Sequence, residues 1–310
     1  MRLMPLIVTL VVALLAVVSR AADTPKQLIA HRGASGYAPE HTSSAYTLAI
    51  EQKADFVEPD LAVTKDNILI CLHDDTLERT TNVAEVFPDR ATPGREGLEG
   101  RDRQDNRKRW LANDFTLAEI KRLDAGKWFD AKFAGEKILT FEEMIALVRG
   151  HGGIYPELKS PPLYTARGVD MEKLFVAVIK KHGLDTPASL KTMPVIIQSF
   201  DEATIRRVAT DLPAIPRVFL TAKDEDVADA RLKVLSKFST GVAPEKFVIA
   251  RHPEMVKASH ALGMTVTSWT FKADDPKILK PTVREEMQHF LYTLGIDALF
   301  TNNPDQFPRR

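Results

Sequence analysis

A short stretch with two carboxylates and a histidine concentrates the reactive side chains of this chain. Glu58 and Asp60 stand two residues apart in the apolar run FVEPDL, and His73 follows thirteen residues after Asp60 at the end of a second apolar run. Residues i and i+2 of a strand point to the same face, so the two carboxylates can converge on one point. Two like charges side by side are costly unless a cation lies between them. The spacing predicts a hard-metal site with a histidine nearby.

Two further apolar runs end in polar residues of complementary chemistry. QLIAHRG, at 27–33, carries His31 and Arg32, and GIYPELK, at 153–159, carries Glu157 and Lys159. The three carboxylates offer the oxygen ligands that Ca²⁺ and Mg²⁺ take. Two histidines, whose pKa is ordinarily about 6.5, can divide the roles of general base and general acid. Because Arg and Lys both bind phosphate oxygens, the set indicates metal-assisted cleavage of a phosphodiester.

Strand and helix patterns alternate along most of the chain. Strands are expected at 27–31, 55–61, 153–159, 195–200, 217–221, 247–250, 265–271 and 298–301. Helices are expected from Thr42 or Ser43 to about 54, and at 117–124, 141–149, 171–182, 202–209, 225–238, 253–262 and 283–294. About eight strands separated by helices favour an α/β TIM (β/α)₈ barrel over an open sheet. The polar residues above fall where strands end, which is where such barrels carry their chemistry.

The length of 310 residues suits a signal peptide at 1–21 followed by one TIM-barrel domain at 22–310. The segment 79–113 is polar and lacks clean periodicity, which predicts an insertion after the second strand region. Its run RDRQDNRKRW, at 101–110, is more typical of a solvated loop than of a basic contact patch. A formal net charge of +0 gives no reason to expect nucleic acid or an anionic membrane surface as a partner.

The N-terminus has the pattern of an export signal. Arg2 precedes an apolar run at 3–18, and Ser19-Arg20-Ala21 offers a small-x-small cleavage site. The alternative is an uncleaved membrane anchor, but the run is short and contains Pro5 and Thr9. Cleavage would leave a formal net charge of −2 and no stable membrane association. We therefore expect a periplasmic or secreted protein.

Cys71 is the single cysteine, which rules out an internal disulfide. It shares a strand face with His73, so a role as a ligand is one alternative. A buried core thiol is the preferred interpretation, because free cysteine behaves as a small apolar side chain.

Several segments together resemble the glycerophosphodiester phosphodiesterases, in particular the exported bacterial branch. They are, in order, LIAHRGASGYAPEHTSSAY, FVEPDLAVTKDNILICLHDDTLERTTN, YPELK, IIQSF, VTSWTF and ALFTNNPD. The resemblance spans nearly the whole mature chain. It implies a TIM-barrel hydrolase that releases glycerol 3-phosphate and an alcohol from deacylated phospholipids such as glycerophosphocholine or glycerophosphoethanolamine.

The resemblance also implies roles for individual residues. His31 and His73 would be the acid/base pair, while Glu58, Asp60 and Glu157 would hold one divalent cation, Ca²⁺ or Mg²⁺. Arg32 would contact the phosphate, with Lys159 beside it. Trp269, which could equally be a core residue, would line the glycerol side of the pocket, and Phe200 would form a wall.

The chain departs from the family pattern at one loop. Where the family usually reads Pro-Glu-Asn-Thr, this sequence has Pro39-Glu40-His41-Thr42. Glu40 is kept and could support the metal site, whereas His41 puts the hydrogen bonding of the loop in doubt. The remaining histidines are interpreted as structural or surface residues: His151, His182, His252, His260 and His289.

Two other functions remain as alternatives. A phospholipase D-like relative on the same barrel would act on intact lysolipids or sphingolipids, although no apolar docking loop is evident. A periplasmic binding protein would keep the pocket without the chemistry. The residue types leave open the choice between Ca²⁺ and Mg²⁺, the preferred head-group alcohol, the oligomeric state, and which histidine is the acid.

Overall fold

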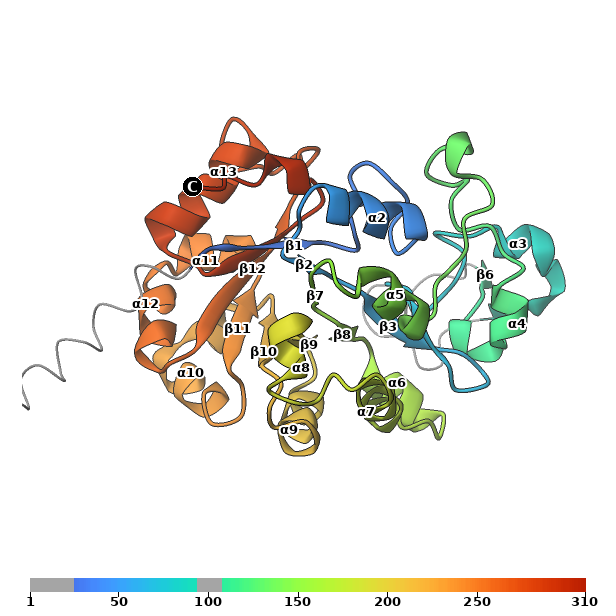
Figure 1. The fold of residues 1–310 in the computed structure, drawn as a ribbon, viewed down its shortest axis with the longest axis horizontal. Helices are drawn as coiled ribbons and strands as arrows, with labels where there is room; N and C mark the ends of the chain where they lie inside the picture. Colours follow the sequence, from blue (N-terminus) through green and yellow to red (C-terminus); the bar gives the residue numbers. More distant parts are fainter. Residues whose placement is uncertain (1–24, 94–107) are drawn as a thin grey trace, which may run out of the picture.

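A computed structural model describes residues 25–93 and 108–310 of the chain. The predicted signal peptide and residues 101–107 of the basic run lie outside this part. Within it, eight strand positions form the central sheet (Figure 1). They are β1 (Gln27–Ala30), β2 (Phe56–Val57) continued by β3 (Asp60–Val63), β7 (Gly153–Ile154) continued by β8 (Glu157–Leu158), β9 (Ile197–Ser199), β10 (Arg217–Thr221), β11 (Gly241–Pro244), β12 (Thr265–Phe271) and β13 (Ala298–Thr301).

The pairing of these strands closes the sheet into a barrel. All neighbours along the series from β8 through β9, β10, β11 and β12 to β13 are parallel. Strand β1 then pairs with both β13 and β2, β2 pairs with β7, and β3 pairs with β8. Because β2 runs on into β3 and β7 into β8, no open edge remains between first and last strands. The predicted TIM barrel is confirmed.

Two barrel strands are broken at a proline. Pro59 separates β2 from β3, and Pro156 separates β7 from β8. Proline has no N–H to donate to a ladder, so each strand is interrupted and resumes with the following residue. The first residues after the two breaks, Asp60 and Glu157, lie in register on adjacent parallel strands. The breaks thus occur beside the carboxylates that the sequence singled out.

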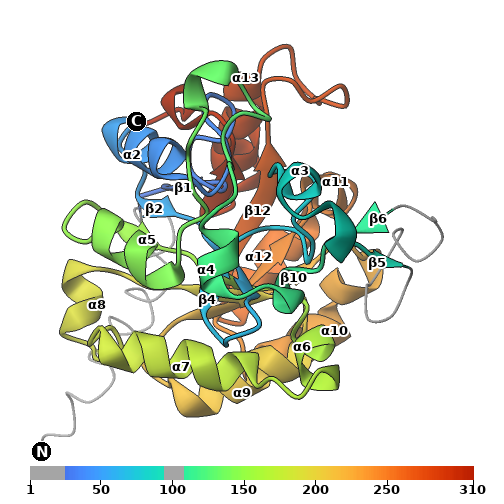
Figure 2. The same ribbon diagram turned by 90° about the vertical axis from the view of Figure 1, so that its right-hand side faces the viewer.

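Helices surround the barrel (Figures 1 and 2). Their bounds are α2 (Ser43–Glu51), α5 (Phe141–Val148), α6 (Pro161–Ala166), α7 (Met171–Lys181), α8 (Ser189–Thr192), α9 (Glu202–Asp211), α10 (Asp229–Leu235), α11 (Lys246–Arg251), α12 (Glu254–Ala261) and α13 (Val283–His289). Side-chain caps fix several starts: Thr42, Thr140, Asp170 and Asp201 each accept a backbone N–H from the first turn. Most expected helices are therefore confirmed to within a few residues.

One expected strand is wrong. Residues 247–250 belong to helix α11, and the barrel strand is formed earlier, by β11. The run Phe-Val-Ile-Ala is short and apolar, and such a run buries its side chains equally well in either structure. Two expected helices are also shorter than predicted: 117–124 contains only α4 (Leu117–Ile120), and 225–238 divides into a 3₁₀ turn, η5 (Asp224–Val227), and α10.

Buried apolar side chains lie on both sides of the barrel wall. Alternate strand residues such as Ile29, Val218 and Phe300 form a small cluster inside the barrel. Their neighbours along the strands, such as Leu28, belong to a larger cluster between strands and helices. Cys71 is part of that larger cluster, and burial raises the pKa of its thiol to about 12. The prediction of a core thiol is confirmed.

The segment predicted as an insertion leaves the barrel after β4 (Leu69–Cys71), which pairs antiparallel with β3. Its described part contains α3 (Val83–Val86) and a two-stranded ribbon of β5 (Thr92–Pro93) and β6 (Lys108–Arg109). Trp110 is buried and donates its indole N–H to the Phe87 carbonyl at 2.7 Å. The described part is therefore packed rather than fully solvated. None of the helices in residues 25–93 and 108–310 has the length and apolar character needed to cross a membrane.

Candidate active site

The candidate site is a cavity of about 280 Å³ at the carboxyl ends of the barrel strands. The predicted site residues that line it are His31, Arg32, Glu58, His73, Glu157, Lys159, Phe200 and Trp269. Asp60, the remaining predicted site residue, lies behind this lining, with Arg32 Nε 3.3 Å from its Oδ2. The fold thus brings together all nine residues, which the sequence spreads over more than two hundred positions.

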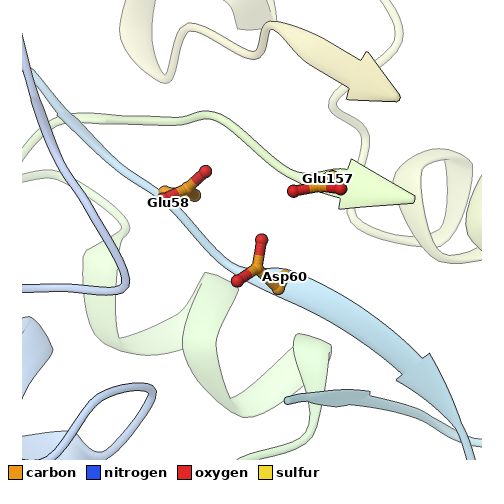
Figure 3. A group of neighbouring side chains, drawn as sticks. All are labelled: Glu58, Asp60 and Glu157. Carbon is orange, nitrogen blue, oxygen red and sulfur yellow. The ribbon is translucent and has the colours of Figure 1, made fainter. Parts of the chain in front are cut away.

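Glu58, Asp60 and Glu157 form a compact carboxylate triad (Figure 3). One oxygen of each lies within 4.8 Å of the others, and all three side chains are buried. Asp60 and Glu157 begin their strands directly opposite one another, and Glu58 lies two residues before Asp60. The expectation that the first pair converges on one point is confirmed, and Glu157 completes the group.

The triad has the properties of a site for a hard cation. Burial, followed by the charges of Asp60 and Glu157, raises the pKa of Glu58 well above its ordinary value. Burial likewise raises the pKa of Glu157 to about 7, against the opposing effect of Lys159. Asp60 Oδ1 is buried and has no hydrogen-bond partner in the described part of the chain. An unpartnered oxygen and mutual repulsion are both relieved by a divalent ion, so these residues fit such a ligand set.

His41 supports the triad from behind. Its Nε2 lies 3.0 Å from Asp60 Oδ2 and its Nδ1 lies 2.8 Å from the hydroxyl of Tyr46, and both side chains are buried. Both contacts are satisfied when Nε2 donates to the carboxylate and Nδ1 accepts from the tyrosine hydroxyl. Lys159 and His41 together outweigh burial and hold the pKa of Asp60 well below its ordinary value. The departure from the family loop therefore gives Asp60 a defined partner.

His31 is held by an amide. Its Nδ1 lies 2.7 Å from Asn302 Oδ1, and because an amide oxygen only accepts, Nδ1 carries the proton. Burial and then the neighbouring Arg32 charge lower the pKa of His31 well below its usual value, so the ring is neutral. Its Nε2 faces the triad, 3.8 Å from Glu58 Oε2, with an unprotonated lone pair. This geometry suits a general base.

His73 is held by a carboxylate instead. Its Nδ1 donates to Asp74 Oδ1 at 2.6 Å. Burial and the positive charges of Lys159 and Arg32 lower the pKa of His73 to about 4, while Asp74 opposes that shift. An anionic partner stabilises the imidazolium that forms when a histidine takes up a proton. The two histidines therefore differ in the charge of their partners.

A chain of ion pairs joins the two sides of the cavity. Arg32 Nη1 donates to Glu40 Oε1 at 3.2 Å, and Arg79 donates to the same carboxylate at 2.7 Å and 3.0 Å. Arg79 also donates to Asp74, the partner of His73. Arg32 and Arg79 outweigh burial and lower the pKa of Glu40 to about 2. Glu40 lies beside Arg32 rather than in the carboxylate triad.

Four residues with defined contacts were missed from the sequence: Gln198, Asn302, Asp74 and Arg79. Gln198 is fully buried and donates to Glu58 Oε1 at 2.7 Å. The sequence could have indicated Gln198, because a single amide inside the apolar strand IIQSF needs a buried hydrogen-bond partner. Asp74 follows His73 directly and could have been proposed as its partner. Asn302 and Arg79 reach the site through loops whose path the sequence pattern does not define.

Aromatic side chains form the opposite wall. Trp269 donates its indole N–H to the Ala243 carbonyl at 2.8 Å, and its ring lies 5.6 Å from that of Phe200 at 85°. Phe300 and Leu220 complete an apolar side facing the charged groups. A cavity with apolar side chains on one part of its lining and charged groups on another suits a small ligand with a carbon skeleton and an anionic group.

The other histidines named from the sequence lie outside this lining. Three of them have acidic neighbours elsewhere: His182 contacts Glu142, His252 lies 3.6 Å from Asp224, and His260 contacts Asp297.

Comparison with known proteins identifies the family of this chain. Residues 31–306 match the model of the glycerophosphoryl diester phosphodiesterase family. The chain is 35% identical to a Bacillus subtilis glycerophosphodiester phosphodiesterase, over 90% of this chain and 84% of the relative. It is 31% identical to one from Arabidopsis thaliana, over 88% and 82%. A solved structure of an Oleispira antarctica phosphodiesterase in complex with the product sn-glycerol-3-phosphate superimposes with a TM-score of 0.70 and 26% identity, covering 92% of this chain and 96% of that one. The resemblance predicted from the motifs is confirmed, and the chain belongs to the glycerophosphoryl diester phosphodiesterase family.

Proposed function

We propose that this protein hydrolyses glycerophosphodiesters, such as glycerophosphocholine or glycerophosphoethanolamine, to glycerol 3-phosphate and an alcohol. The observation that carries the proposal is the cavity that unites a carboxylate triad, two cationic side chains and two neutral histidines. Family membership makes the chain a phosphodiesterase. The product named for the Oleispira antarctica structure supports glycerol 3-phosphate as the released phosphate ester.

Binding follows from the charges of the site. Arg32 and Lys159 attract the phosphate, and each is kept in place by a carboxylate, Glu40 and Glu157 respectively. The glycerol moiety lies against the aromatic wall at Trp269, where its carbon atoms contact the ring. A divalent cation held by the triad, Ca²⁺ or Mg²⁺, would screen the charge that develops on the phosphate oxygens.

The hydrogen bonds of the two histidines support a division of the proton transfers. His31, with its proton fixed on Nδ1 by Asn302, takes the proton of the nucleophilic hydroxyl on Nε2. His73, with Asp74 behind it, delivers a proton to the departing alcohol. A phosphate bound to Arg32 and Lys159 offsets the two positive charges that oppose protonation of His73, so the substrate itself favours the imidazolium.

We propose further that the protein is exported, with residues 1–21 as a cleaved signal. Support comes from the basic, apolar and small-residue regions of that segment. The substrates are small and polar, so the mature enzyme needs no stable contact with a membrane.

The activity and its metal dependence are tested by one assay. Purified mature protein should release glycerol 3-phosphate from glycerophosphocholine, EDTA should stop the release, and either Ca²⁺ or Mg²⁺ should restore it. The physical reason is that the buried triad repels itself and the phosphate when no cation is present. A folded protein that releases nothing with any cation, yet cleaves lysophosphatidylcholine, would instead be the phospholipase D-like enzyme. Ligand binding without product would indicate the binding protein.

The proton-transfer roles predict unequal effects of two histidine substitutions. His31→Ala and His73→Ala should each lower kcat on glycerophosphocholine by about 10²- to 10⁴-fold. On a glycerol phosphodiester of p-nitrophenol, whose phenolate leaves without a proton, His73→Ala should lose far less than His31→Ala. His182→Ala, the same change outside the cavity, is the control. Equal losses of both site variants on both substrates would contradict the assignment.

We hold that the attacking group is the glycerol hydroxyl next to the phosphate ester, which gives a cyclic phosphate that water then opens. A phosphodiester of 1,3-propanediol lacks this hydroxyl and should be inert, while still competing with glycerophosphocholine for the site. Phosphorus NMR should detect the cyclic species in early turnover. Rapid hydrolysis of the propanediol diester would exclude this route.

His41 should set the affinity of the triad for its cation. His41→Ala removes the donor to Asp60 and is expected to raise the Kd for the cation by about 10- to 100-fold, as loss of a supporting hydrogen bond does at other metal sites. His41→Asn, the residue usual in the family, should recover much of the affinity by donating from its amide. Calorimetric titration of the protein with Mg²⁺ or Ca²⁺ measures this without turnover. Equal affinities in all three proteins would assign His41 a purely structural role.

A further inference from the structure

We propose that a second cavity, next to the catalytic one, receives the leaving alcohol and favours a positively charged head group of the amino-alcohol class. This inference rests on the proposed function, since it assigns the other half of the same substrate. It addresses the head group that the sequence left open.

The second cavity has a volume of about 370 Å³ and lies between the loops that follow β8 and β9. It shares Glu157, Lys159 and Phe200 with the catalytic cavity, so the two cavities adjoin at these residues. Its remaining lining residues are Leu158, Ser160, Pro161, Pro162, Ser199 and Asp201. A diester whose phosphate lies at Lys159 can therefore extend one arm into each cavity.

The second cavity lies on the side of the histidine that protonates the leaving group. Ser160, in its wall, donates its hydroxyl to Asp75 Oδ2 at 2.9 Å, and Asp75 follows the pair His73-Asp74 in the same loop. Lys159, which lines both cavities, also lines the catalytic cavity together with His73. The arm that accepts a proton from His73 therefore leaves toward this cavity, while the glycerol arm stays at Trp269.

The chemistry of the wall suits a cation. Phe200 is 45% exposed and stands nearly perpendicular to Trp269, so its ring keeps an accessible surface at the boundary of the cavities. Asp201 caps α9 through Oδ1, and no group in residues 25–93 or 108–310 donates a hydrogen bond to its Oδ2. Lys159, the cation of the lining, is paired with Glu157 at 3.1 Å. An aromatic ring and a carboxylate together recognise quaternary and primary ammonium groups.

A neutral head group would gain no binding free energy from the Phe200 ring or from the Asp201 carboxylate. Glycerophosphoglycerol has the same phosphate and glycerol arm as glycerophosphocholine, but its leaving alcohol carries no charge. The pair of substrates thus isolates the second cavity, because every contact in the catalytic cavity is common to both. The ratio of their kcat/KM values reports the head group alone.

The test measures this ratio in two variants and a control. Phe200→Leu keeps an apolar side chain but removes the ring, and should lower the choline-to-glycerol ratio by about 2- to 30-fold. Asp201→Asn removes the charge but keeps the helix cap, since Asn and Asp cap equally well, and should lower the ratio by about 2- to 5-fold. Asp170→Asn makes the same change at the cap of α7, outside both cavities, and should leave the ratio unchanged.

A binding measurement separates this inference from the proposed function. Choline chloride titrated into the unmodified protein and followed by saturation-transfer NMR should bind, and Asp201→Asn should weaken it. Choline binding of this kind in a protein that cleaves neither diester would overturn the proposed hydrolysis and leave the cation site standing. Turnover of both diesters with a ratio unaffected by Phe200→Leu and Asp201→Asn would overturn the cation site and leave the hydrolase standing.

Discussion

The repulsion among three buried carboxylates is the constraint on which the site depends. Strand register, not attraction, places oxygens of Glu58, Asp60 and Glu157 within 4.8 Å of one another, and burial raises the free-energy cost of their charges further. A hydrogen bond to each carboxylate offsets part of this cost. Gln198 donates to Glu58, His41 to Asp60, and Lys159 to Glu157. One oxygen of Asp60 has no hydrogen-bond partner among residues 25–93 and 108–310. The barrel, whose packed core fixes the strand ends, supplies the rigidity that holds like charges together.

The positive charges that pair with the carboxylates are the same ones that we propose to bind the phosphate. Lys159 lowers the pKa of Asp60 and of His73. In the proposed mechanism it therefore keeps the metal ligand Asp60 ionised, and it keeps His73 unprotonated until the phosphate binds. Arg32 is linked through Glu40 and Arg79 to Asp74, the partner of His73. In the proposed mechanism, phosphate binding and proton delivery therefore depend on one set of charges. A change at Arg79 would then affect both.

Much of this arrangement was predictable from the sequence because it follows from local pattern. Alternation in strands placed Glu58 and Asp60 on one face, and the count of strands with intervening helices indicated a barrel. The misplaced strand at 247–250 shows the limit: four apolar residues fit helix or strand, and only the packing of β11 between its neighbours decides. Contacts such as His31 with Asn302 join residues 271 positions apart, and no local pattern specifies such a pair.

His31 and His73 have different hydrogen-bond partners, so the two ends of the cavity differ in their acid–base chemistry. Burial and the Arg32 charge keep the His31 ring neutral, with Asn302 accepting from Nδ1, whereas the Asp74 carboxylate behind His73 favours the charged ring. In the proposed mechanism, a diester lying across the site meets the base His31 at one end and the acid His73 at the other. The second cavity, lined by Ser160 and Asp201, lies on the His73 side. In that arrangement the glycerol arm stays bound on the His31 side, and the alcohol on the His73 side leaves. Selectivity for that alcohol would then come from the cavity walls on the His73 side, formed by the residues after β8 and β9, and not from the carboxylate triad.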